Sequence, residues 1–527
     1  FSFSSSSSSL SVQYRNNPDV VLQQVLNTPI VSSDGTVGTQ FREELVSILR
    51  CILHSDPVWR SSTENSITVK TISGGLTNML YLVKHCQQFD TSASTAASPK
   101  HVVVRLYGTG TSEYIDRNTE NVVFAKLSIA GVGPAFHGLF LNGRVEGYLP
   151  ATPLESSLEM GRGDIFPQIA AATAQLHLVD IPEILTENWL WSKTQQFLSL
   201  SARAYSKNVR TSASNDDDDD DVVIINNEQN MLMVQTMQTE FNWYKECFSR
   251  LYDGIMSGSS SSSPSDCTGS GTHTCTTCAV GTADDNRGTI ATTTMNTTAA
   301  TNAGRIFGMQ EVLCHNDLLS GNILVSATDA DADADAAVLL AEVEDKGQHR
   351  SKSTKAKYAT NLYLIDYEYA AYNYRAFDIA NHLCEHCGYD FDVRNNFPTD
   401  GFMLEFLNMY TASIAAASAG CVRSSGYKCS AVPVDWFGTE FSRLFSVSDD
   451  RTISAADKRE REAFISGLQE IVKYQLLASH LFWGSWALLQ AATATIDFDY
   501  AQYAQLRLDG YFFHKQQFQQ QLEQQLI

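Results

Sequence analysis

The stretch VLCHNDLLSGNILV (Val312 to Val325) and the later stretch LYLIDYEY (Leu362 to Tyr369) decide the predicted fold of this chain. Apolar and β-branched residues at both ends of the first stretch and at the start of the second predict short strands. Three polar side chains follow these strands: Asp317 and Asn322 in the first stretch and Asp366 in the second. The pattern predicts loops between strands that bring two carboxylates and an amide together.

These residue types at this spacing indicate phosphoryl transfer. The reaction needs a carboxylate to orient the attacking hydroxyl, and metal ligands that neutralise charge on the β- and γ-phosphates. Asp317 and Asn322 have the separation found in kinase catalytic loops, and Asp366 takes the place of the metal-binding Asp that follows such a loop. The structural alternative is a surface turn capped by Asp and Asn.

The residues before this region predict a small sheet and one helix. Strand-like stretches have β-branched or aromatic residues over a suitable length, and Asn118 to Ile129 has helical periodicity. The predicted strands are Ser66 to Ile72, Leu80 to Lys84, His101 to Tyr107 and Gly143 to Leu149.

A glycine-containing segment between the first two predicted strands is a candidate phosphate cradle, because glycine allows close backbone approach to a phosphate. The alternative is a plain hairpin turn. The candidate nucleotide-binding residues here are Ser73, Gly74, Gly75, Thr77 and Asn78.

Arg105, near the end of the third predicted strand, and Glu120, on the following helix, are expected to form an ion pair that holds the α- and β-phosphates, as Lys and Glu do in kinases. The alternative is a structural pair.

The later chain is mostly helical in pattern, so the predicted fold is α+β, with a strand-rich first part and a helical second part. The expected helices are Ile165 to Leu178, Met231 to Tyr252, Phe402 to Ala417, Arg459 to Ala492 and Tyr500 to Phe513. The expected organisation is a low-complexity, flexible N-terminus over 1–40, a first lobe over 41–150 and a helical lobe over 151–527. Low-complexity residues predict disordered insertions at 206–221, 257–304 and 327–360.

Composition indicates a globular protein of the cytoplasm. The formal charge of -22 owes much to the Asp run at 216–221 and the alternating Asp residues at 329–335, and no basic stripe indicates nucleic-acid binding. The eleven cysteines lack the dense spacing of a secreted disulfide scaffold. The apolar stretch Tyr474 to Ile496 is interrupted by polar residues, which favours a buried helix over a transmembrane segment.

Two other patterns have some features of metal sites. Cys275 and Cys278 have zinc-ligand spacing, but they lie among Ser, Thr and Gly residues, and the other C-x-x-C pair, Cys384 and Cys387, is distant in the sequence. The Asp runs lack the glycine turn and terminal Glu of a calcium-binding EF-hand loop.

Several motifs together resemble the choline/ethanolamine kinase family, which has a bilobal protein-kinase-like fold. The motifs are SGGLTNMLY (73–81), VVVRLYG (102–108), NGRVEGYL (142–149), CHNDLLSGNIL (314–324), IDYEYAAYNYRAFDIANHLCEH (365–386), ASHLFWGSWALLQA (478–491) and TIDFDYAQYAQLRLDGYF (495–512). The resemblance implies ATP and Mg²⁺, with Asp317 as catalytic base and Asn322 and Asp366 as metal ligands. It places Glu146 and Tyr148 at the interlobe hinge on the nucleotide side. Around the amine it places Glu368, Glu385, Trp483, Trp486, Phe498 and Tyr503.

The resemblance leaves the amine open between two substrates. A primary ammonium needs hydrogen-bond acceptors, whereas a quaternary ammonium depends on aromatic faces, and the sequence offers both. Leu318, Leu319 and the run CGYDFDVRNNFP (387–398) look like the ethanolamine branch, whereas Gln502 to Asp509 look like the choline branch. The expectation is ethanolamine kinase activity, the first step of a route to phosphatidylethanolamine, with choline kinase as the alternative.

Two further alternatives are an inactive kinase-like scaffold and a kinase for an aminoglycoside or protein acceptor. A homodimer is implied by the resemblance alone.

Overall fold

The computed structural model describes residues 38–72, 78–86, 100–108, 111–184, 189–211, 220–260, 297–326, 361–419, 441–445, 453–494 and 498–524. The chain packs into two compact units. The first consists of residues 1–187, 312–372 and 420–431, and the second of residues 188–311, 373–419 and 432–527. The predicted lobe boundary at residue 150 stays a prediction.

The first unit is built on a five-stranded antiparallel sheet in the order β1-β2-β3-β5-β4. Its strands are β1 (Ile67–Ile72), β2 (Asn78–His85), β3 (His101–Tyr107), β4 (Phe136–Phe140) and β5 (Gly143–Gly147). The four strands predicted from the sequence are all present. The fifth, β4, was not predicted; its residues FHGLF lack strict alternation and include a glycine, which weakens the strand pattern.

Helix α3 (Thr39–Ile52) covers one face of this sheet. Phe41, Leu45 and Leu49 on its apolar stripe are fully buried in one hydrophobic cluster with Val102 and Val104 of β3. Burying large apolar side chains in this way contributes about 1.5–3 kcal/mol each. The helix therefore fixes the strands that carry the nucleotide-side residues.

The first unit also contains the catalytic stretch. A second sheet has the order β6-β8-β9, in which β8 (Ile323–Ser326) pairs antiparallel with β9 (Asn361–Leu364). The other elements are α4 (Pro57–Arg60), η1 (Glu64–Ser66), η2 (Thr111–Glu113), α5 (Arg117–Ala130), β6 (Thr152–Pro153), η3 (Ser157–Gly161), α6 (Phe166–His177), β7 (Glu311–Cys314) and η5 (Ser320–Asn322). Strand β10 (Ala371–Tyr374) leads the chain into the second unit.

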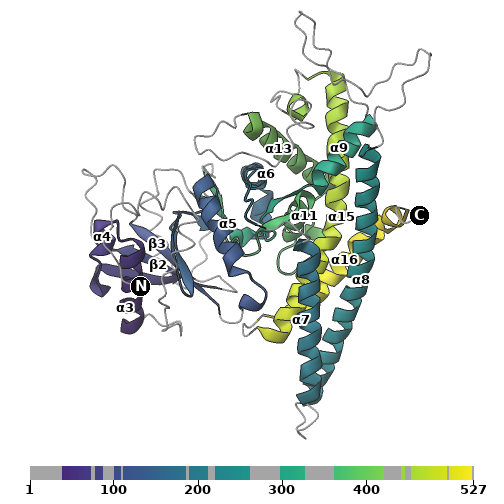
Figure 1. Cartoon of the computed structure of the whole chain (residues 1–527). Helices are drawn as coiled ribbons and strands as arrows, with labels where there is room; N and C mark the ends of the chain where they lie inside the picture. Colours follow the sequence, from purple (N-terminus) through teal and green to yellow (C-terminus); the bar gives the residue numbers. More distant parts are fainter. Residues whose placement is uncertain are drawn as a thin grey trace, which may run out of the picture. The chain divides into compact units, whose positions relative to one another are not determined.

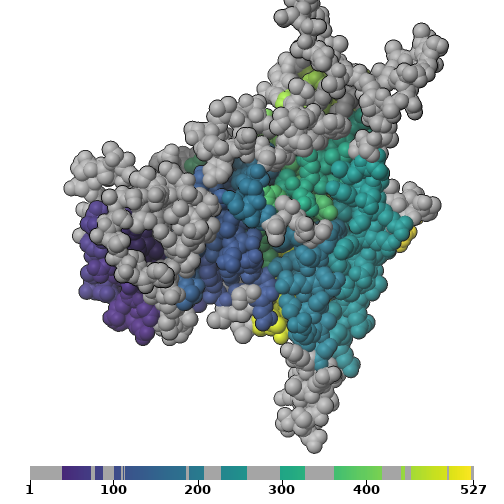
Figure 2. Space-filling model, viewed as in Figure 1, coloured from purple at the N-terminus to yellow at the C-terminus, as the bar shows by residue number. Residues whose placement is uncertain are grey.

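The second unit is helical. Its helices are α7 (Trp189–Thr211), α8 (Asp220–Ser260), α9 (Thr297–Met309), α11 (Arg375–Glu385), α12 (Val393–Asn396), α13 (Asp400–Ala419), α15 (Ala455–Thr493) and α16 (Tyr500–Gln524). Helix α15 is central, with α7, α8, α9 and α16 beside it (Figure 1). All residues from Tyr474 to Gln490 are buried, so the predicted buried helix is confirmed. The teal surface in Figure 2 includes helix α8. Leu232 of this helix is exposed.

The predicted disordered insertions are partly wrong at their edges. Helix α7 continues to Thr211 and α8 begins at Asp220, inside the predicted insertion 206–221. Helix α8 continues to Ser260 and α9 begins at Thr297, inside the predicted insertion 257–304. The rest of these two insertions, and all of 327–360, lie outside the described residues.

Helix α9 was missed because its small residues give no strong apolar pattern. Those residues let it approach α15 closely. A Cβ at Gly304 would lie 1.9 Å from the carbonyl oxygen of Phe464, and one at Gly467 would lie 2.0 Å from that of Thr301. No larger side chain fits at either contact, so packing against α15 stabilises a helix that propensity alone disfavours.

Within the described residues, no helix is both long enough and apolar enough to cross a membrane.

Candidate active site

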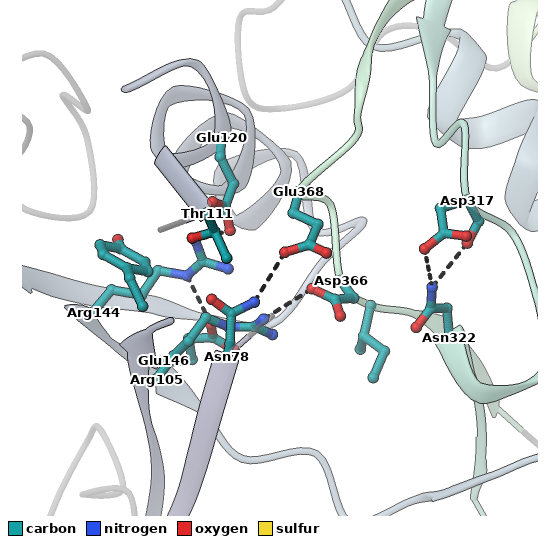
Figure 3. Close-up of polar contacts among 12 residues, drawn as sticks. Asn78, Arg105, Thr111, Glu120, Arg144, Glu146, Asp317, Asn322, Asp366 and Glu368 are labelled. Atoms are coloured by element: carbon teal, nitrogen blue, oxygen red, sulfur yellow. Dashed lines mark hydrogen bonds and ion pairs between the residues drawn. The ribbon is translucent and has the colours of Figure 1, made fainter. Parts of the chain in front are cut away.

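The loop after β7 holds Asp317 in a fixed orientation. The side-chain amide nitrogen of Asn322 donates to the backbone carbonyl of Asp317 at 2.8 Å and to its carboxylate Oδ2 at 3.1 Å. Asp317 is half-buried, and Asn322 is buried at the end of η5. The spacing of four residues between them therefore closes a compact loop in which the amide orients the carboxylate, as Figure 3 shows.

The residues just before Asp317 tie this loop to the segment after β9. The Nδ1 atom of His315 accepts from the backbone N–H of Asp317 at 3.3 Å, so its Nε2 carries the proton and donates to the carbonyl of Ile365 at 2.8 Å. Asn316 has a left-handed backbone, with φ of 64°, and donates to the carbonyl of Tyr369 at 2.9 Å. Asparagine tolerates this conformation better than most residues. Hydrogen bonds from His315 and Asn316 thus connect the catalytic loop to the IDYEY segment.

Asp366 follows β9 and turns sharply toward the five-stranded sheet. It too has a φ of 64°, and the preceding Ile365 N–H donates to the carbonyl of Asn322 at 3.0 Å. Its carboxylate Oδ1 accepts from Nη1 of Arg105 at 2.8 Å (Figure 3). The β8–β9 ladder therefore brings Asp366 beside Asn322, as the sequence predicts.

Arg105 and Glu120 do not form the ion pair expected from the sequence. Arg105 donates through Nε to Glu146 at 2.8 Å, whereas Glu120 accepts from Nη1 of Arg144 at 2.6 Å. The reason is the strand register: Arg105 on β3 lies directly opposite Arg144 on β5, and Glu146 accepts from both, with its distance to Arg144 Nε being 2.7 Å. Two carboxylates and two guanidinium groups alternate, and this buried chain continues from Arg105 to Asp366.

Burial and charge act in opposite directions on this chain of groups. Burial alone would raise the pKa of Glu120, but Arg144 and Arg117 hold it at about 2. Burial alone would also raise the pKa of Glu146, and Arg105 and Arg144 bring it below its ordinary value. Burial would lower the pKa of Arg105, yet Glu146 and Asp366 raise it above its usual range. The four groups are therefore charged at neutral pH and hold one another in place.

Glu368, expected beside the amine, contacts polar groups of the sheet and of α5. Its Oε2 accepts from the side-chain amide of Asn78 at 3.0 Å (Figure 3). The same oxygen lies 3.7 Å from Nη1 of Arg117. Arg117 also donates to Glu120 at 2.7 Å and to the hydroxyl of Thr111 at 2.6 Å. Glu368 therefore lies on the nucleotide side of this arrangement, and its assignment to the amine stays a prediction.

The donor atoms at Asn322 and Asp366 fit a magnesium ion. Since the amide nitrogen of Asn322 donates to Asp317, its amide oxygen faces the other way, and amide and carboxylate oxygens are the ligands that Mg²⁺ prefers. Within the described residues, Asp366 uses only Oδ1 toward Arg105, which leaves Oδ2 for a cation.

The predicted amine residues of the second unit gather around the start of α16. Trp483 and Trp486 have ring centroids 5.4 Å apart, Trp486 lies 5.7 Å from Tyr500, and Phe498 lies 4.8 Å from Tyr500 and 6.0 Å from Tyr503. We call these five residues the aromatic cluster. Phe498 is its most exposed member, at 38%, while the others are buried. The indole N–H of Trp483 donates to the side chain of Asn381 at 2.7 Å, which fixes this ring.

Glu385, at the end of α11, is linked to the aromatic cluster through Arg507. Nη2 of Arg507 donates both to Glu385 Oε1 and, at 2.7 Å, to the hydroxyl of Tyr503. The second unit thus brings together five predicted amine residues: Glu385, Trp483, Trp486, Phe498 and Tyr503. Such a set of aromatic faces and a carboxylate can hold a cation.

Some predicted residues are not tested by this geometry. Asn78 begins β2, whereas Ser73, Gly74, Gly75 and Thr77 lie outside the described residues. Tyr148, just after β5, is half-buried, and its ring lies 5.2 Å from that of His101. The nucleotide roles of these residues stay predictions.

Four side chains that complete these arrangements were not predicted: Arg117, Arg144, Asn381 and Arg507. A signal existed for two of them. Arg144 and Glu146 are two positions apart, so they lie on the same face of a strand. Arg507 interrupts an otherwise apolar helical stripe, and a cation buried in this way requires a nearby acid.

Comparisons with known proteins place the chain in one family. The model of the choline/ethanolamine kinase family matches residues 69–256 and 282–512. A human choline/ethanolamine kinase is 26% identical over 87% of this chain and 83% of its own length, and a probable ethanolamine kinase A of Dictyostelium discoideum is 24% identical over 88% and 89%.

Solved structures show the same fold. An ethanolamine kinase of Plasmodium vivax has a TM-score of 0.52 at 17% identity, covering 92% of both chains. A choline kinase of Cryptosporidium parvum has a TM-score of 0.50 at 18% identity, covering 90% of this chain and 96% of its own. These neighbours confirm the protein-kinase-like fold, and the family match extends over well more than half of the chain. The chain belongs to the choline/ethanolamine kinase family and is a phosphotransferase that acts on an alcohol acceptor.

Proposed function

We propose that this protein transfers the γ-phosphate of ATP to the hydroxyl of ethanolamine. The observation that carries the proposal is the arrangement of Asp317, Asn322 and Asp366, in which an amide orients one carboxylate and the strand ladder places the other beside it. Intact polar groups at all three positions argue against an inactive scaffold.

In the proposed reaction, the hydroxyl oxygen of the amine attacks the γ-phosphorus as the bond to the β-phosphate oxygen breaks. Asp317 accepts the hydroxyl proton, and the products are phosphoethanolamine and ADP. Asn322 fixes the orientation of the Asp317 carboxylate. Asn322 and Asp366 would hold Mg²⁺. When bound, this ion would neutralise negative charge on the phosphates.

Arg105 is assigned to the α- and β-phosphates of the nucleotide. Its guanidinium is fixed on one side by Glu146, which leaves it preorganised where charge is needed. Glu120 supports Arg105 indirectly, because it pairs with Arg144, which in turn pairs with Glu146. Asn78 and Tyr148, and the glycine segment 73–77, are assigned to the nucleotide as well.

The amine is assigned to the aromatic cluster and Glu385. A carboxylate with a free oxygen favours ethanolamine, because a primary ammonium must donate its N–H groups. The second candidate is choline, and the observation in its favour is the number of aromatic faces in the cluster. The cysteine pattern of the sequence supports the cytoplasm as the site of action, and a homodimer is the assembly that we infer from the family.

Substrate profiling tests the proposal. ADP release is measured with ethanolamine, choline and serine in turn, with MgATP at saturation, beside the Asp317→Asn variant as a control for contaminating activity. The expected result is the highest kcat/KM for ethanolamine and a kcat lowered by about 10²–10⁴-fold in the variant. A higher kcat/KM for choline would select the second candidate, and no turnover of either amine would overturn both.

A further inference from the structure

Arg507 contacts the aromatic cluster through Tyr503, and none of the roles assigned above accounts for it. Its side chain is fully buried, and its guanidinium carbon lies 4.1 Å from the ring centroid of Phe391 and 5.2 Å from that of Tyr503. A buried guanidinium requires an acid, and Glu385 is its ion-pair partner. The first question is what this pairing does to Glu385.

The ion pair gives the two oxygens of the Glu385 carboxylate different surroundings. Oε1 accepts from Arg507, whereas in the described residues Oε2 accepts no hydrogen bond. The Glu385 side chain is 10% exposed, so it lies at the edge of the buried region with one carboxylate oxygen fixed and one available. A fixed oxygen also fixes the direction of the other.

Arg507 also determines how Tyr503 can bind a ligand. The Tyr503 hydroxyl accepts two hydrogen bonds from Arg507, from Nε at 2.9 Å and from Nη2 at 2.7 Å. A phenolic oxygen has two lone pairs, so both are used and the hydroxyl can only donate. Tyr503 can therefore offer a cation its ring but not its oxygen.

We propose that Arg507 is a positioning residue for the amine: it holds Glu385 with one free carboxylate oxygen and limits Tyr503 to contact through its aromatic face. This inference rests on the proposed function and deepens it. It predicts that the cation is bound by aromatic faces and a single carboxylate oxygen. A pocket of this kind accepts N-methylated amines as well as ethanolamine, because it does not require several N–H donors.

The first test is Arg507→Lys, with KM measured separately for amine and ATP. Lysine keeps the charge but has no planar fork that can serve Glu385 and Tyr503 together. The expected result is a KM about tenfold higher or more for each amine the enzyme uses, since a lost charged hydrogen bond costs this much. KM for ATP should stay within about twofold of wild type.

A matched control is Arg375→Lys. Arg375 is also fully buried, stacks at 4.0 Å on Phe307 and donates to the hydroxyl of Tyr410, but its contacts include neither Glu385 nor Tyr503. This variant should lower stability without raising KM for the amine. If Arg507→Lys behaves in the same way, Arg507 has only a structural role and the inference is wrong.

The second test is Tyr503→Phe, which keeps the ring and stands in for the first test should Arg507→Lys not fold. Because the oxygen is committed to Arg507, the change should alter KM for ethanolamine and choline by the same factor. If KM for ethanolamine rises about tenfold more than KM for choline, the oxygen accepts from the ammonium and the inference is overturned.

Binding measurements separate this inference from the proposed function. Titration of wild-type protein with each amine, followed by tryptophan fluorescence of the cluster, gives affinities without turnover. If wild type binds and turns over an amine but Arg507→Lys leaves its affinity unchanged, only the inference fails. If wild type neither binds nor turns over either amine, the inference falls with the proposed function.

Discussion

Arg105 of β3 and Asp366 after β9 are joined by an ion pair, with 2.8 Å between Nη1 and Oδ1. Arg105 is 3% exposed, and the side chain of Asp366 is 21% exposed. The pair connects the group assigned to the nucleotide phosphates with the group assigned to the metal. Arg105 therefore competes with a cation for the carboxylate of Asp366 while it attracts the phosphates.

Arg105→Met should raise KM for ATP and lower the Mg²⁺ concentration that gives half-maximal rate. The loss of a buried guanidinium should raise KM for ATP about tenfold or more, since hydrogen bonds to charged groups contribute about 1.5–3 kcal/mol. The same loss leaves Asp366 without its counter-charge, so the Mg²⁺ concentration for half-maximal rate should fall. Steady-state kinetics over a Mg²⁺ series at fixed ATP measure both effects.

The control for this variant is Arg162→Met, because Arg162 pairs with Asp164 and Glu159 but is 40% exposed. Both kinetic constants should stay at their wild-type values. A parallel rise of KM for ATP and of the Mg²⁺ requirement in Arg105→Met would contradict the competition between Arg105 and the metal.

Asp317→Asn should lower kcat by about 10²–10⁴-fold without unfolding the protein, because the amide cannot accept the hydroxyl proton. KM for ATP should change little. Thermal unfolding checks the fold and ADP release checks the rate. Asp56→Asn is the matched control: Asp56 caps α4 through the N–H groups of Val58 and Trp59, and asparagine caps equally well, so its rate should be that of wild type.

The arrangement of Asp317, Asn322 and Asp366 could be predicted from the sequence because it depends on local geometry. Asp317 and Asn322 are five positions apart in one loop, and Asp366 closely follows β9, which pairs with β8, the strand just after that loop, so two short sequence patterns contain the arrangement. Arg144 could not be predicted in the same way. Its role comes from lying opposite Arg105 in the register of β3 and β5, which a sequence pattern does not state.

The same distinction explains the elements that were missed. The apolar periodicity of α5, α6 and α15 predicts each helix by itself. Helix α9 depends on glycine contacts with α15 at Gly304 and Gly467, and nothing in its own thirteen residues indicates that partner. Prediction of α9 failed because its stabilising contact comes from a distant part of the chain; α3 and α7 were also not predicted.

Arg144→Met should lower the free energy of unfolding by about 3 kcal/mol, because breaking a buried ion pair leaves charge uncompensated. Arg144 is fully buried between Glu120 and Glu146. Urea denaturation of the variant measures the loss. Arg162→Met, which removes a partly exposed Arg, should cost under about 1 kcal/mol. Equal losses in the two variants would show that the buried chain of charges contributes no more than a surface pair.

The histidine pair of α15 and α16 should make the protein less stable in mild acid. Nε2 of His480 and Nδ1 of His514 are 2.9 Å apart, and both side chains are buried. Burial lowers the pKa of His514 to about 4, and burial, His514 and Arg507 lower the pKa of His480. The unfolded chain binds these protons near pH 6.5, whereas the folded chain does not bind the His514 proton until about pH 4.

The stability from His514 is therefore present above pH 6.5 and is lost progressively as the pH falls below it. At pH 5.5 the loss should be about 1.4 kcal/mol. Urea denaturation at pH 7.5 and 5.5 should show that His514→Gln loses less stability on acidification than wild type does. This window lies above the range in which Glu120, with its pKa near 2, would contribute. Between pH 9 and 7.5 the two proteins should respond alike, and an equal loss between pH 7.5 and 5.5 would mean that His514 does not remain neutral in the folded protein.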